Sequence, residues 1–114
     1  MMNIRQQQFE DIKENKYQAF VVKAKQFLQK NYPERTNQLD EKKLGAIVES
    51  SILRAESYKI VTEQGIISFL ELMFSISFDF DSNERTNWTR KILNEHQLTE
   101  PEKIMKIINT LNKF

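Results

Sequence analysis

The residues of this chain whose types and spacing could do chemistry gather in one stretch, FDFDSNERTNW. Asp79 and Asp81 stand one residue apart, and Asn83 follows at the same interval. Oxygen ligands at alternate positions open the calcium-binding loops of helix–loop–helix proteins. Such a loop then needs a glycine for its sharp turn and a glutamate that closes the site, but this chain has Glu84 and Arg90 at those positions. The sequence therefore predicts that no metal ion binds here.

A pair of carboxylates can also serve as general acid and general base, provided that their surroundings set their pKa values apart. Asp79 and Asp81 are candidates for such a pair. The structural alternative is that both side chains accept hydrogen bonds from backbone amides in the loop and at the start of the next helix. We expect the structural role, with the rings of Phe78, Phe80 and Trp88 packed inward.

Two further side chains could take part in acid–base or metal chemistry. Glu71 lies in the most apolar segment of the chain, where burial would raise its pKa and where Ser68 and Ser75 fall on the same helical stripe. A narrow polar stripe is more often the exposed face of a helix, and we expect that arrangement. His96 is the single histidine and there is no cysteine, so a transition-metal site would depend on carboxylates. We expect no metal and no cofactor.

The charge and composition narrow the classes of partner. The 17 basic and 16 acidic residues leave a net charge of +1, which gives little attraction for nucleic acids or anionic membranes. Lys16, Lys23 and Lys30 recur every seven residues and could follow a phosphate backbone, but nearby acidic residues favour a solvated helix face. No apolar run has the length of a signal peptide or a membrane span, and the lack of cysteine fits a reducing compartment. The sequence favours a cytoplasmic protein that binds neither nucleic acid nor membrane.

Helices must position these side chains, because the chain has only two glycines and two prolines and no β-hairpin signal. We predict an all-α fold, a bundle of about five helices that forms a single domain over residues 1–114. The most apolar helix, at about residues 63–77, is predicted to be central.

Cap and breaker residues predict where the helices begin and end. The first helix should stop before Pro33, and a polar connection should follow it. Asp40 and Thr62 should cap the second and third helices, and Thr99 with Glu102 should form a capping box on the last. After the first helix, the expected ranges are about Glu41 to Ser57, about Glu63 to Ser77, Trp88 to about His96, and from Thr99 onward.

The run YKIVTEQGIISFLELMFSISFDFDSNERTNWTRKIL, residues 58–93, resembles small bacterial proteins of uncertain function that are often encoded beside type VI secretion spike, tip and effector genes. Lys59 and Ser77 depart from the family pattern, which tends to have glycine at both positions. The resemblance implies a small helical fold, and its mostly aromatic and aliphatic motif indicates packing rather than catalysis. The matching positions are Tyr58, Glu63, Phe69, Leu72, Met73, Phe74, Phe80, Asp81, Trp88, Ile92 and Leu93.

We expect a protein-binding module without enzymatic activity, because the chain has no catalytic motif. The resemblance implies an accessory, adaptor or immunity protein of bacterial type VI secretion whose partner is an effector or a spike component. Two alternatives stay open, a small hydrolase that uses a pair of acidic residues and a nucleic-acid-binding helical protein. A homodimer is a further option, since an apolar helix face can pair with itself. The candidate partner-binding residues are Asp79, Asp81, Glu84, Arg85 and Trp88.

Overall fold

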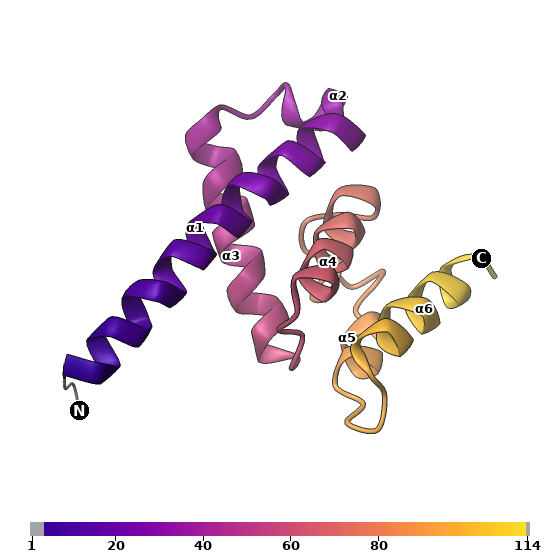
Figure 1. The fold of residues 1–114 in the computed structure, drawn as a ribbon. Helices are drawn as coiled ribbons and strands as arrows, with labels where there is room; N and C mark the ends of the chain where they lie inside the picture. The colour runs from indigo at the N-terminus through magenta and orange to yellow at the C-terminus, as the bar shows by residue number, and fades with distance from the viewer. Residues whose placement is uncertain (1–3, 114) are drawn as a thin grey trace. The chain divides into compact units, whose positions relative to one another are not determined.

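The computed structural model describes the backbone of residues 4–113 and the side chains of residues 16–113. Within this range the chain forms six α-helices and no β-strand, which confirms the predicted all-α fold (Figure 1). The one helix that was not expected is a single turn. The helices are α1 (Ile4–Asn31), α2 (Pro33–Thr36), α3 (Glu41–Ser57), α4 (Glu63–Ser75), α5 (Trp88–Leu93) and α6 (Glu100–Leu111).

The chain divides into two compact units, residues 1–48 and residues 49–114. The division falls within α3, so the second unit holds the end of α3 together with α4, α5 and α6. The prediction of one domain over residues 1–114 stays a prediction. Every residue of the site described below belongs to the second unit.

In the first unit, Pro33 sets the boundary between α1 and α2. Tyr32 has φ −134° and ψ 57°, outside the helical region, because the proline ring disfavours helical geometry in the residue before it. The same proline then begins α2, where the sequence had predicted only a polar connection. Proline suits the first turn of a helix, since its missing N–H would have no intrahelical partner there. The predicted end of the first helix is confirmed.

The buried side chains of α1 repeat at helical spacing. Lys16, Lys23 and Lys30 are exposed on this helix. The sequence also places the apolar residues Phe9 and Ile12 in this helix, and both lie outside the described side chains. The buried residues of α1 are Phe20, Val21, Ala24 and Leu28. The next helix, α3, begins as predicted, because the Lys43 N–H donates to Asp40 Oδ1 at 2.7 Å.

In the second unit, α4 supplies much of the core. Its first turn is capped by Thr62, whose hydroxyl accepts a hydrogen bond from the Gly65 N–H at 3.0 Å. The ring of Phe69 is fully buried between those of Tyr58 and Phe80, with centroids 6.2 Å and 5.2 Å away. More than half of the helix is buried, as expected for the most apolar segment: Gly65, Ile66, Phe69, Leu70, Leu72, Met73 and Phe74.

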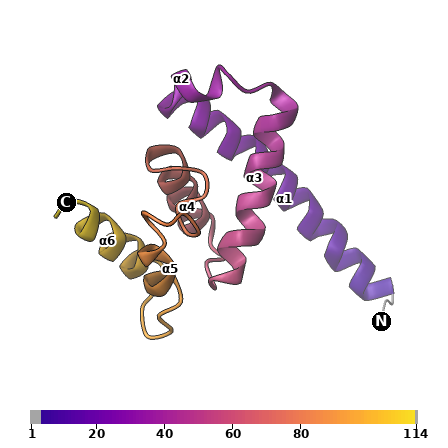
Figure 2. The same ribbon diagram turned by 180° about the vertical axis from the view of Figure 1, so that it is seen from behind.

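The last two helices are short, and α6 packs against both α4 and α5 (Figures 1 and 2). The capping box predicted at the start of α6 is present: the Thr99 hydroxyl accepts from the Glu102 N–H, and the Glu102 carboxylate accepts from the Thr99 N–H. Two predicted ends were too long, since α4 stops at Ser75 and α5 stops at Leu93 rather than near His96.

The first turn of α6 holds the corner between α3 and α4. The carboxylate of Glu100 accepts hydrogen bonds from the Val61 N–H at 3.1 Å and from both the N–H and the hydroxyl of Thr62. One turn further on, the buried Lys103 donates from Nζ to the backbone oxygen of Tyr58 at 2.8 Å, at the end of α3. An anion thus meets the positive end of one helix and a cation meets the negative end of another. Tyr58 is fixed in place by this arrangement.

Candidate functional site

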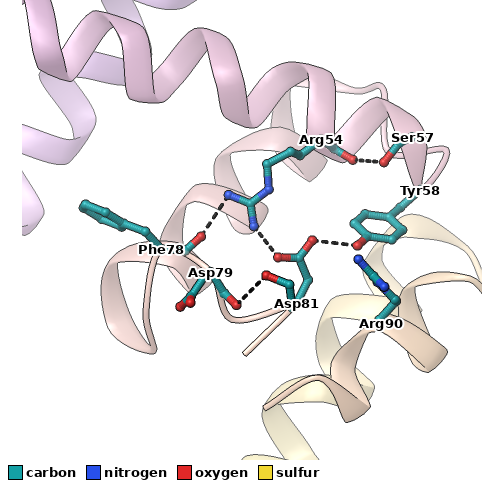
Figure 3. Close-up of a pocket in the computed structure, with 8 residues that line it drawn as sticks. Arg54, Ser57, Tyr58, Phe78, Asp79, Asp81 and Arg90 are labelled. Atoms are coloured by element: carbon teal, nitrogen blue, oxygen red, sulfur yellow. Dashed lines mark hydrogen bonds and ion pairs between the residues drawn. The ribbon is translucent and has the colours of Figure 1, made fainter. Parts of the chain in front are cut away.

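A cavity of about 520 Å³ opens in the second unit where the end of α3, the loop of residues 76–87 and the beginning of α5 meet (Figure 3). Four charged side chains line it, Arg54, Asp79, Asp81 and Arg90. Three hydroxyl-bearing side chains complete the polar lining, Ser57, Tyr58 and Ser82.

Asp81 lies at the centre of the site and is only 6% exposed. One carboxylate oxygen, Oδ1, pairs with the guanidinium of Arg54, and the other, Oδ2, accepts from the Tyr58 hydroxyl at 2.6 Å (Figure 3). The Arg54 guanidinium also donates to the backbone oxygen of Phe78 at 2.8 Å. A buried carboxylate needs such partners, since burying it alone would be very unfavourable. Asp81 therefore ties the loop after α4 to the last turns of α3.

Arg54 also contacts the aromatic core. Its guanidinium carbon lies 5.4 Å from the centroid of the Phe69 ring, within the range of a cation–π interaction. Arg54 and Tyr58 stand four residues apart on consecutive turns, so both reach the same face of the chain. The sequence gave no reason to single out Arg54, and Tyr58 stood out only as one of the positions that carry the resemblance.

Tyr58 connects the buried carboxylate to Arg90. Burial, and next the hydrogen bond to Asp81, raise the pKa of Tyr58, so the phenol stays protonated and donates to that carboxylate. On its other side the Tyr58 hydroxyl lies beside the guanidinium of Arg90 (Figure 3), and this neighbour raises the pKa of Arg90. Hydrogen bonds thus join Arg54, Asp81 and Tyr58, and Arg90 lies next to Tyr58 at the surface; these four residues are hereafter the polar chain.

The two aspartates of the loop have different surroundings. Asp79 is exposed, and its Oδ1 lies 3.5 Å from the Asn83 amide nitrogen. The prediction that both carboxylates accept hydrogen bonds from backbone amides is wrong for Asp81, which binds two side chains instead because the loop turns it toward α3. The backbone cap in this loop comes from Asn83, whose side-chain oxygen accepts from the Arg85 N–H at 2.9 Å.

The aromatic residues of the loop differ in burial. Phe80 is fully buried, as predicted, but Phe78 is 38% exposed and Trp88 is half-buried. The expectation that all three rings pack inward is therefore wrong for Phe78, whose ring contacts that of Phe74 edge-on, with centroids 5.0 Å apart. Phe78 lines the cavity and leaves an apolar edge at its rim.

The structure places the five predicted partner-binding residues in two environments. Asp79, Glu84 and Arg85 are exposed in the loop, and Trp88 is half-buried at the start of α5. Asp81 is buried with both carboxylate oxygens engaged. Whether these residues contact a partner stays a prediction. Sequence reasoning missed Arg54 and Tyr58 as site residues and considered Arg90 only as a position that fails a calcium loop.

The geometry gives little support to the other candidates, a metal site and a buried acid at Glu71. Among the side chains that the structure describes, no group of three or more histidine, aspartate or glutamate residues could hold a metal ion. His96 is exposed in the turn after α5. Glu71 is half-buried and burial raises its pKa, whereas Ser75 donates to the backbone oxygen of Glu71 rather than to its carboxylate. Within the described range, no helix has the length and apolar content to cross a membrane.

Comparison of the chain with protein-family models, curated proteins and solved structures finds no match. The polar chain and its cavity therefore have to be interpreted from their own chemistry.

Proposed function

We propose that this chain is a protein-binding module without enzymatic activity, and that it serves as an accessory, adaptor or immunity protein of type VI secretion by binding an effector or a spike component. The observation that carries the proposal is the state of Asp81. Both of its oxygens are occupied by Arg54 and Tyr58, an arrangement suited to fixing a surface rather than to exchanging protons with a substrate. The link to secretion rests on the resemblance of residues 58–93.

The surface around the polar chain has the residue types that anchor protein interfaces. Arginine and aromatic side chains are enriched among the residues that contribute most binding energy. Arg90 is exposed beside Tyr58, and the ring of Phe78 is partly exposed at the cavity rim. Large apolar side chains are exposed elsewhere on the same unit: Leu53, Val61, Met105 and Ile108.

Affinity capture with the products of the adjacent genes tests the proposal. The wild-type chain should recover one of them in a stoichiometric complex that survives size-exclusion chromatography. Failure with every neighbouring product would remove the proposal. A matched pair of variants checks the surface. Phe78→Asp should weaken capture of the partner, and Ser75→Asp, at an exposed position, serves as the control. Ile76→Asp would be unsuitable as a control because that side chain is half-buried.

The accessory and immunity roles can be separated in cells. An immunity protein should restore growth to cells that express the captured effector. An adaptor should leave that toxicity unchanged but should be required for release of the effector into the medium.

A further inference from the structure

We infer that the cavity beside the polar chain binds a carboxylate, supplied by an acidic side chain of the partner protein, with Arg90 as the group that receives it. The inference rests on the proposed function for the source of the carboxylate. The choice of a carboxylate as the ligand rests on the geometry of the second unit alone.

Arg90 offers exposed hydrogen-bond donors to the cavity. Arg54 is already bound to the Asp81 carboxylate and to the Phe78 carbonyl. A guanidinium carries five N–H donors, and a phenol oxygen that is itself donating can accept only one or two of them. Arg90 is exposed, and among residues 16–113 no carboxylate forms an ion pair with it. An incoming group at this position therefore has to be an acceptor.

The contact with Tyr58 makes Arg90 a prepared receptor. Tyr58 is buried and is held by Asp81 on one side and by the corner between α3 and α4 on the other. Its hydroxyl lies beside the Arg90 guanidinium (Figure 3) and limits the positions that this side chain can take, so less conformational entropy is lost when a ligand binds the N–H groups. A planar carboxylate matches that fork with two parallel hydrogen bonds.

The charges around the cavity favour a singly charged anion. Asp81 is paired with Arg54, and the exposed charges at the opening are those of Arg90 and Asp79. A phosphate, with a charge near −2, would be repelled by Asp79 more strongly than a carboxylate would. A cation has no free carboxylate to meet inside, because both Asp81 oxygens are occupied.

The size and the remaining lining suit a side chain. A volume of about 520 Å³ lies within the range of small-molecule sites and exceeds what one carboxylate fills. The partly exposed ring of Phe78 offers an apolar surface to the methylene groups that carry the acid. A glutamate of the partner would satisfy both the donors and the ring.

A titration of the ¹⁵N-labelled chain tests the inference directly. The probes are acetyl-Ala-Glu-Ala-amide, the same peptide with glutamine, and succinate as a free dicarboxylate. The side-chain Nε–Hε signal of Arg90 should shift saturably with the glutamate peptide, and the glutamine peptide should bind at least about tenfold more weakly, as charged hydrogen bonds are lost.

Two variants locate the effect. Arg90→Gln should abolish the saturable shifts at Tyr58 and Ser82, whereas Lys91→Gln, an exposed neighbour on the same helix that does not line the cavity, should preserve them. Circular dichroism confirms that each variant is folded. Equal binding by Arg90→Gln and wild type, or no saturable shift with the glutamate peptide, would overturn the inference. If succinate binds and the glutamate peptide does not, a partner protein is not the source of the carboxylate.

Capture of the partner by the same variants keeps the two proposals distinct. If the peptide does not bind but the wild-type chain still recovers a partner, the carboxylate site is wrong and the proposed function stands. If the peptide binds through Arg90 but no partner is recovered, the proposed function is wrong.

Discussion

Replacing Asp81 with alanine removes the centre of the polar chain. The side chain of Asp81 is 8% exposed and that of Arg54 is 29% exposed, so the pair is buried on one side and reached by water on the other. Breaking a fully buried ion pair by removing one partner destabilises a protein by about 3–5 kcal/mol. Because solvent screens Arg54, we expect a smaller loss in the free energy of unfolding, about 2–3 kcal/mol.

For a chain of 114 residues, that loss corresponds to a drop in Tm of roughly 8–12 °C. Urea denaturation followed by circular dichroism measures the free energy, and a thermal scan measures the Tm. Asp79→Ala is the matched control, because this neighbouring aspartate is exposed and its replacement should change stability by no more than about 0.5 kcal/mol. The double variant Arg54→Met with Asp81→Leu should be more stable than Asp81→Ala, since it leaves no unpaired charge.

The reasoning fails if Asp81→Ala is no less stable than Asp79→Ala. It also fails if the double variant is the least stable of the three, since the pair would then contribute through attraction rather than through the penalty of an unpaired charge.

Three further changes test other parts of the second unit. A Cβ at Gly65 would overlap Glu100 Oε1 and lie 2.8 Å from Cγ2 of the buried Ile60, so Gly65→Ala should destabilise the chain by about 1–3 kcal/mol in urea denaturation, whereas Gly45→Ala, whose nearest atom is 3.6 Å away, should be neutral or stabilising. Lys59 has φ 67°, a left-handed conformation, so Lys59→Gly should stabilise by about 1 kcal/mol; no gain would show that Lys59 relaxes without strain. Burial raises the pKa of Glu71 above its ordinary 4.5, so its ionisation weakens the fold as pH rises, and Glu71→Gln should have the higher Tm at pH 7 but not below about pH 4.5. If Glu71→Gln and the wild type have the same Tm at pH 7 as well as below pH 4.5, this prediction is wrong.

The helix ends that the sequence predicted correctly depend on contacts between near neighbours. Asp40, Thr62 and Thr99 each accept a hydrogen bond from an amide three residues further on, so the relevant partners stand within one turn in the sequence. The short α2 was missed because a single turn has no periodicity to detect, although Pro33 is a typical first helical residue.

The polar chain could not be predicted in the same way. Arg54 and Asp81 are 27 positions apart, and Tyr58 and Asp81 are 23 apart. Their meeting depends on the path of the loop after α4, which no local pattern specifies. Sequence reasoning identified the acidic loop as the region of interest, but it placed the importance of Asp81 in backbone capping rather than in its contacts with α3.

Lys59, at φ 67°, has a backbone conformation that glycine adopts most readily, and the structure shows what this conformation does. The left-handed residue allows the Ile60 N–H to reach the backbone oxygen of Ala55 at 2.9 Å, which closes the end of α3.

The hold of α6 on the corner between α3 and α4 makes the site dependent on residues that lie outside it. Glu100 and Lys103 do not line the cavity, yet they fasten the two ends of the segment that carries Tyr58. A polypeptide that ends before Thr99 would keep all four residues of the polar chain but would lose the contacts that align them. Fragments made to map binding should therefore retain the final helix, and a negative result from a shorter piece would say nothing about Arg90.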